Sequence, residues 1–161
     1  MGRYEDELAV RSLAAAYSDA VNRRDGPGMA AVYADDGELH LAPPARPLVG
    51  KDFLTKAFTR LVEKDREYLF QMTHSGVVEV DGDKATGRWW FSEVKKPTGQ
   101  PMEMVMGVYQ DEAIRTADGW RFSKRTVSGM MRWELPEGAD ISFTARDAMP
   151  AFLPLTGLPR P

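Results

Sequence analysis

Cysteine is missing from this sequence, and its 161 residues include only two histidines. Without cysteine there are no disulfides, thiolate nucleophiles or thiolate metal ligands, and His40 and His74 alone are too few for a histidine-rich metal site. No apolar run is long enough to span a membrane, and acidic residues appear where a signal peptide would have its apolar core. We therefore expect a cytoplasmic protein with no membrane anchor, metal or cofactor.

A strong excess of either charge is also lacking. Lys and Arg number 21 against 24 Asp and Glu, which leaves a net charge of -3. So small a charge does not indicate a nucleic-acid partner or binding to an acidic membrane surface. Hydrophobic residues make up 43% of the chain, an ordinary share for a globular protein, so its length predicts one domain with a core of its own.

The first part of the chain repeats apolar residues at helical spacing. Helices are expected over residues 4–22, 28–34 and 51–64. Between the last two, the pattern predicts a turn at residues 35–37 and a short strand at residues 38–41.

From residue 68 onward, alternation and hairpin signals replace helical spacing. Four long strands are expected, over residues 68–80, 84–94, 102–114 and 120–133. Helices segregated from an antiparallel sheet predict an α+β fold. Because the strands are long for a small domain, we expect a strongly curved sheet that closes over the helices as a cone and leaves an internal cavity.

This domain is expected to occupy residues 1–136. Residues 137–161 are rich in proline, and we expect them to form an irregular arm that packs on the body or on a partner subunit.

Several pieces of the sequence, taken in order, resemble the SnoaL-like branch of the nuclear transport factor 2-like superfamily. They are residues 13–25, residues 33–36, residues 49–51, His74 with residues 78–85, and Tyr109 with residues 118–122. The resemblance implies a mixed, mostly antiparallel sheet wrapped around three N-terminal helices. It also implies a small apolar ligand in the cavity and, by analogy with dimeric members, a homodimer.

Two members of this group, scytalone dehydratase and hexachlorocyclohexane dehydrochlorinase, pair a histidine on the first long strand with an aspartate near the end of the first helix. The resemblance places His74 at the first position and Asn22 at the second. His74 also shares strand parity with Phe70, Met72 and Val78, so we expect it to face the apolar interior and act as a general base. An amide at position 22 cannot raise its basicity, although it can fix the tautomer or bind a substrate oxygen.

Aromatic and methionine side chains are the candidates for the wall of the cavity. The predicted ligand-binding residues are Tyr17, Trp89, Phe91, Met106 and Ser128. Such side chains line adaptable apolar pockets, although they also form ordinary cores. The opposite strand face, which carries Trp90, remains an alternative, and Glu93 is an acid or base only if the face of Trp89 is the inner one.

These observations leave two functions open. The first is a cofactor-independent lyase, isomerase or cyclase that acts on an aromatic or polyketide-like molecule with His74 as the base. The second is a non-catalytic binder of a small apolar molecule, or an accessory subunit of an oxygenase-like complex. The retained His74 favours the first and Asn22 favours the second. A homodimer is expected in both cases, because an outer sheet face that carries Trp90 or Tyr109 needs cover.

Overall fold

The computed structural model describes residues 2–136, so the arm expected at residues 137–161 lies outside the described residues. The helices are α1 (Arg3–Asn22), α2 (Gly26–Ala31) and α3 (Lys51–Glu63). The strands are β1 (Tyr33–His40), β2 (Leu48–Val49), β3 (Arg66–Asp81), β4 (Lys84–Pro97), β5 (Glu103–Thr116) and β6 (Gly119–Glu134). Each predicted helix and long strand is therefore present, with β2 as an addition.

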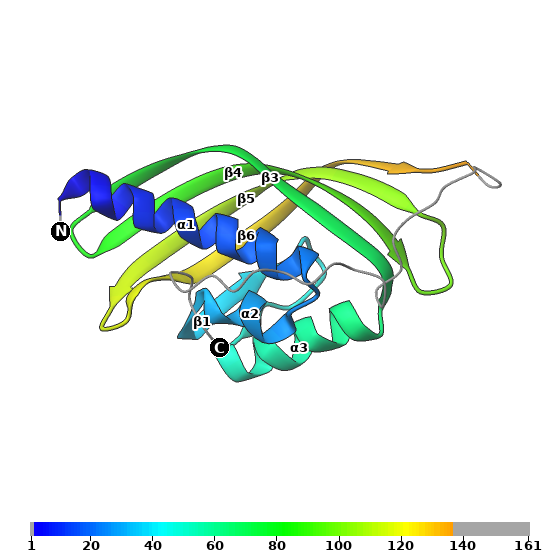
Figure 1. Ribbon diagram of the computed structural model, residues 1–161, viewed down its shortest axis with the longest axis horizontal. Coiled ribbons are helices and arrows are strands. Elements are labelled where there is room, and N and C mark those ends of the chain that lie inside the picture. The colour runs from blue at the N-terminus through cyan, green and yellow to red at the C-terminus, as the bar shows by residue number, and fades with distance from the viewer. Residues whose placement is uncertain (1, 137–161) are drawn as a thin grey trace.

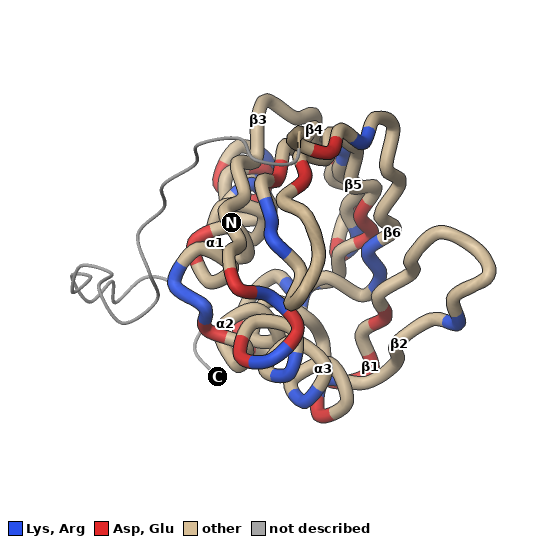
Figure 2. The backbone as a smooth tube through the Cα atoms, turned by 90° about the vertical axis from the view of Figure 1, so that its right-hand side faces the viewer, with Lys and Arg blue, Asp and Glu red and all other residues tan. Residues whose placement is uncertain are grey.

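The strands form one mixed, curved sheet in the order β2-β1-β6-β5-β4-β3. Among these described strands, β1 and β6 run parallel and all other neighbours are antiparallel. Figure 1 shows β3 to β6 curving past α1, with α2, α3 and β1 gathered below them. Figure 2 shows residues of both charges interspersed along helices and strands. The predicted α+β fold with a curved, mostly antiparallel sheet is confirmed.

Helix α1 forms because its sequence suits its first turn and gives it one apolar face. Glu5 and Asp6 lie in its first turn, where the helix dipole favours negative charge. Val10, Leu13, Tyr17 and Val21 recur at helical spacing and are all buried. This buried stripe packs α1 against the inner face of the sheet.

The turn predicted at residues 35–37 is wrong, because these residues are part of β1. Tyr33 lies opposite Phe122 and Glu38 lies opposite Lys124, so five residue steps on β1 match two on β6. The extra residues bulge out of the ladder. A Cβ on Gly37 would lie 2.9 Å from the carbonyl oxygen of Ala34, so only glycine fits this bulge.

A buried ion pair between neighbouring strands lies at the centre of the core. Arg125 of β6 donates to both carboxylate oxygens of Asp111 on β5, at 2.8 and 2.7 Å, and each side chain is 1% exposed. The guanidinium also lies 4.5, 4.2 and 4.3 Å from the ring centres of Tyr17, Tyr109 and Phe122. Burial alone would lower the pKa of Arg125, but Asp111 more than offsets this and the net shift is upward. The pair thus ties α1 to two strands.

Replacing Arg125→Met should lower the free energy of unfolding by about 3–5 kcal/mol, because the carboxylate of Asp111 would remain buried without its partner. The double variant Arg125→Met/Asp111→Leu should recover much of this loss. Urea unfolding of both variants measures the effect. A single variant as stable as the wild type, or a double variant no better than the single one, would contradict this account.

Candidate functional site

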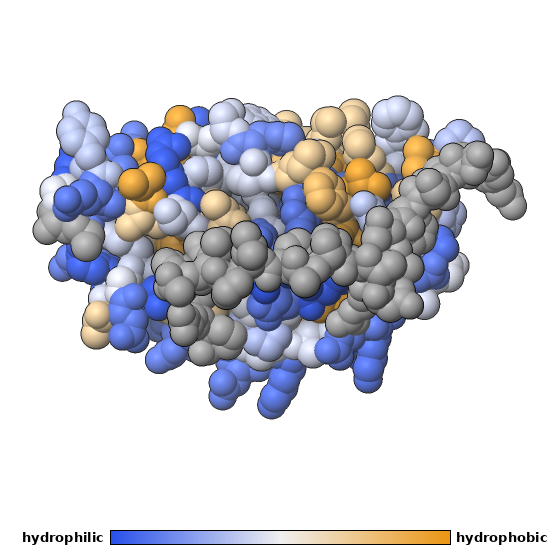
Figure 3. Space-filling model, in the orientation of Figure 1, coloured by the Kyte–Doolittle hydropathy of each residue, from blue (hydrophilic) through white to orange (hydrophobic). Residues whose placement is uncertain are grey.

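A cavity of about 360 Å³ lies between the helices and the inner face of the sheet. Helices α1, α2 and α3 contribute to its wall, as do strands β1 to β6. Its apolar lining includes Tyr17, Val21, Met29, Leu39, Phe58, Leu69, Phe91, Val105 and Val127. On the outer surface, Figure 3 shows exposed apolar side chains gathered over the strands beyond α1. The size and lining match those of small-molecule sites in proteins.

One wall of the cavity is polar and comes from β3 and β4. Gln71 lies directly across from Glu93 in the sheet, and its Nε2 donates to Glu93 Oε2 at 3.1 Å. Two residues further along β4, Lys95 places its Nζ 3.1 Å from Glu93 Oε1. All three side chains line the cavity. The apolar space therefore ends on an amide, a carboxylate and an ammonium group.

Two tyrosines complete this end of the cavity. Tyr109 accepts a hydrogen bond from Gln71 Nε2 at 2.7 Å, and its ring stacks on Phe91 with centres 4.3 Å apart. Tyr17 meets Tyr109 edge to face, with ring centres 6.1 Å apart. Burial raises the pKa of both hydroxyls well above the ordinary value. Both tyrosines therefore stay neutral at physiological pH, and neither supplies a base.

His74 does not lie in the lining of this cavity, contrary to the expectation that it faces the apolar interior. The strand register shifts between Thr73 and Gly76, so the parity that links His74 to Val78 in the sequence is broken by a bulge. Phe70, Met72 and His74 point to the outer face, where each is exposed. There the His74 Nε2 lies 2.9 Å from the hydroxyl of Ser92.

Asn22 lies beside the cavity and is fully engaged with the backbone of β3. Its Nδ2 donates to the carbonyl oxygen of Gln71 at 2.8 Å, and its Oδ1 accepts from the amide of Gln71 at 2.7 Å. Because β3 is an edge strand of the sheet that the described residues form, Asn22 replaces one pair of the ladder bonds that a neighbouring strand would form. Only an amide can both donate and accept here, whereas an ionised carboxylate only accepts.

The structure separates the other predicted binding residues. Tyr17 and Phe91 line the cavity as expected. Trp89 is on the inner face but packs beyond the cavity, beneath the guanidinium of Arg11. Met106 and Ser128 lie on the outer face of the sheet. Met106 is two residues from Val108 on β5, and Ser128 is the cross-strand partner of Val108, whereas Tyr109 faces inward.

Sequence reasoning missed several polar and aromatic residues of the lining, among them Gln71, Lys95 and Tyr109. Their signal was strand parity: Lys95 shares the face of Phe91 and Glu93, and Gln71 alternates with outward Phe70 and Met72. The alternative that put Glu93 on the inner face is the one the structure shows.

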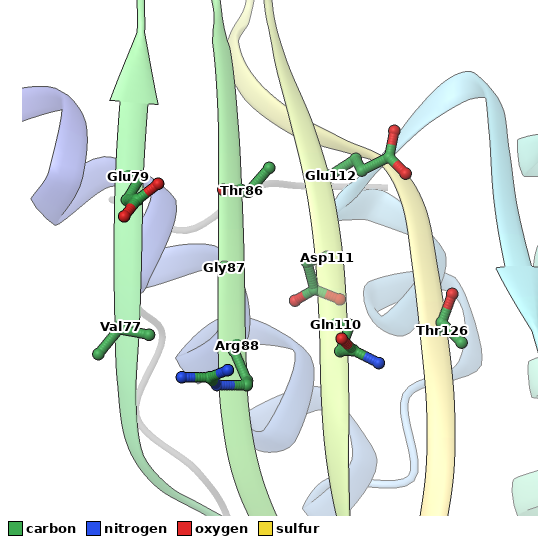
Figure 4. Close-up of a pocket in the computed structure, with 9 residues that line it drawn as sticks. All are labelled: Val77, Glu79, Thr86, Gly87, Arg88, Gln110, Asp111, Glu112 and Thr126. Atoms are coloured by element: carbon green, nitrogen blue, oxygen red, sulfur yellow. The ribbon is translucent and has the colours of Figure 1, made fainter.

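A second hollow lies on the outer face of β3 to β6. Its volume is about 470 Å³. Figure 4 shows most of its side chains on the side of the four strands away from the helices; Asp111, also labelled there, belongs to the buried pair with Arg125. They are polar for the most part, and include Glu79, Arg88, Gln110 and Glu112. Glu112 already pairs with Lys124 at 3.2 Å. The cavity under the helices is the better ligand site, because it combines apolar walls with a few converging polar groups.

The described part of the chain has neither a cluster of metal ligands nor a membrane-spanning helix. Residues 2–136 hold no group of three or more acidic or histidine side chains arranged to bind a metal ion. Within the same residues, no helix has the length and apolar character needed to cross a bilayer.

A curved mixed sheet closed by helices around an apolar cavity defines the nuclear transport factor 2-like class of fold. The sequence pattern of the SnoaL-like domain matches residues 2–126, and the chain belongs to this family. The predicted resemblance is thereby confirmed. No curated protein sequence matches the chain significantly.

Solved structures with the same fold share little sequence with this chain. A proposed aromatic ring hydroxylase from Novosphingobium aromaticivorans has a TM-score of 0.75 and 24% identity, over 84% of this chain and 96% of that one. A proposed scytalone dehydratase from the same organism has a TM-score of 0.71 and 18% identity, over 80% and 87%. The hexachlorocyclohexane dehydrochlorinase of Novosphingobium barchaimii has a TM-score of 0.76 and 20% identity, over 88% and 95%. These likenesses establish the fold alone.

Replacing Asn22→Asp should destabilise the protein by about 1–3 kcal/mol, because a carboxylate oxygen would face the carbonyl oxygen of Gln71 and leave it unpaired. Thermal and urea unfolding measure the loss. Gln100→Glu makes the same amide-to-acid change at an exposed turn and should have little effect. Equal stability of both variants would show that the two hydrogen bonds from Asn22 to the backbone of β3 contribute little to stability.

Proposed function

We propose that this protein binds a small aromatic or polyketide-like molecule in the cavity under the helices. The observation that carries the proposal is the combination of an apolar lining with one polar wall at Gln71, Glu93 and Lys95. A flat apolar ligand would fill the space between Phe58 and Phe91, and a single oxygen function would reach the polar wall. The cytoplasmic location expected from the sequence stays a prediction.

If the protein is an enzyme, a cofactor-independent proton transfer suits this site best. Titratable groups line the cavity, and those on its polar wall belong to Glu93 and Lys95. The role of general base that the sequence predicts for His74 gains no support from its place on the outer face. The alternative remains a binder that releases its ligand unchanged.

Filling the cavity should abolish binding. A Cβ added to Gly129 would meet only Val105 Cγ1, at 4.0 Å, so a larger side chain can enter the cavity without moving the backbone. We expect Gly129→Phe to weaken the binding of 2-tetralone, a two-ring aromatic ketone, by at least about tenfold, or ~1.4 kcal/mol. Isothermal titration calorimetry measures the affinity.

The neighbouring Met130→Phe is the matched control, because Met130 is 67% exposed and does not line the cavity. It should bind the ketone as the wild type does. The proposal fails if the wild type shows no saturable binding, or if Gly129→Phe binds as tightly as the control.

We further propose that the protein is a homodimer in which the outer faces of two sheets meet. Six large apolar side chains on the outer face of the sheet are 40–56% exposed. They are Phe70, Met72, Trp90, Met106, Met131 and Trp133. A contiguous apolar patch of this kind marks a protein contact, and a twofold axis lets one face cover its own copy.

Light scattering coupled to gel filtration tests the assembly. The wild type should have the mass of two chains at micromolar concentration, and Met106→Lys should have the mass of one, because it buries an unpaired charge in the interface. Leu8→Lys, which changes an exposed residue of α1, should remain dimeric. A monomeric wild type would refute the dimer and leave the patch to a different protein.

A further inference from the structure

The polar wall of the cavity holds a carboxylate and an ammonium group next to each other on one strand. Glu93 and Lys95 are two residues apart on β4, so both side chains leave the same face of the sheet. Their charged atoms are 3.1 Å apart, and their side chains are only 16% and 18% exposed. A base and a cation are therefore presented together to whatever occupies the cavity.

Each group is also held in place by a partner outside the pair. Gln71 donates to the second oxygen of Glu93, and Ser18 donates to Gln71 Oε1 at 3.1 Å. Lys95 has a second carboxylate, Glu103, at 3.5 Å. Side chains fixed by such contacts lose little entropy when a ligand binds, which is what a reacting site needs.

We propose that Glu93 and Lys95 together catalyse proton transfer on a ketone bound in the cavity, an inference that rests on the proposed function. Glu93 accepts a proton from the carbon next to the carbonyl. The electrons of that C–H bond become the new carbon–carbon double bond, and those of the C=O double bond move to the oxygen. Lys95 donates a hydrogen bond to this oxygen, which stabilises the enolate.

Return of the proton completes the reaction. Glu93 gives it back to the same carbon or, in a conjugated ketone, to a more distant carbon, which shifts the double bond. No electrons leave the ligand and nothing but a proton is exchanged. The substrate class is therefore an aromatic or conjugated ketone with an acidic neighbouring C–H bond.

The charges around the site remain balanced during this step. Before the transfer, Glu93 and Glu103 offset Lys95 and Arg132, which contacts Glu103. After the transfer, Glu93 is neutral and its negative charge lies on the enolate oxygen beside Lys95. Charge therefore moves only across the short distance between neighbouring groups, which keeps the electrostatic cost low in a partly buried site.

Deuterium exchange on 2-tetralone tests the inference directly. Enolate formation replaces hydrogen by deuterium at the carbon between the ring and the carbonyl, and proton NMR in D₂O follows the loss of that signal. The wild type should accelerate exchange over buffer. Glu93→Gln should remove about 10²–10⁴-fold of this acceleration, and Lys95→Met about 10²–10³-fold. Calorimetry should show that Glu93→Gln still binds the ketone.

Glu79→Gln is the matched control, because it removes a carboxylate from the outer face of β3 and should leave exchange unchanged. Binding by the wild type without faster exchange would overturn this inference and leave the proposed function standing. Exchange that survives in Glu93→Gln and is lost in His74→Ala would also overturn it, and would assign the base to His74. A wild type that does not bind the ketone would overturn both proposals.

Discussion

The ion pair between Arg125 and Asp111 is the contact on which the interior depends. Its cation is enclosed by the faces of Tyr17, Tyr109 and Phe122, so a charged pair that would be costly alone becomes the centre of an aromatic cluster. Tyr17 and Tyr109 also line the cavity. The geometry of the ligand site is therefore set by a pair that the ligand need not touch.

A second constraint acts at the edge of the sheet, where β3 has no further neighbouring strand among residues 2–136. Asn22 supplies the missing backbone hydrogen bonds at Gln71. The side chain of Gln71 in turn donates hydrogen bonds to Glu93 and Tyr109. The end of α1, the edge strand and the polar wall are thus one connected unit. At the end of the first helix the chain uses an amide to hold this strand.

Much of the fold could be predicted from the sequence, because helical spacing in residues 4–22 and 51–64 and alternation after residue 68 are long and regular. The bulges could not. Those near Asp35 and Ser75 depend on partner strands that local patterns do not reveal. The bulge near Ser75 reverses the alternation of side chains along β3. Val78 therefore packs on the core, while His74, which shares its parity in the sequence, lies on the outer face. Tyr17 and Phe91 lie on the cavity wall, where regular helical spacing and regular strand alternation place them. Their role in binding a ligand stays a prediction.

The central claim is that ligand binds under the helices and not on the outer face of the sheet. The methionine methyl groups distinguish the two locations, because Met29 lines the cavity whereas Met106 and Met131 are exposed on the outer face. Carbon-13 NMR of methyl-labelled methionine should show the Met29 signal shifting as 2-tetralone is added, with the Met106 and Met131 signals unchanged. Shifts confined to Met106 and Met131, or an unchanged Met29 signal at saturating ligand, would contradict the account.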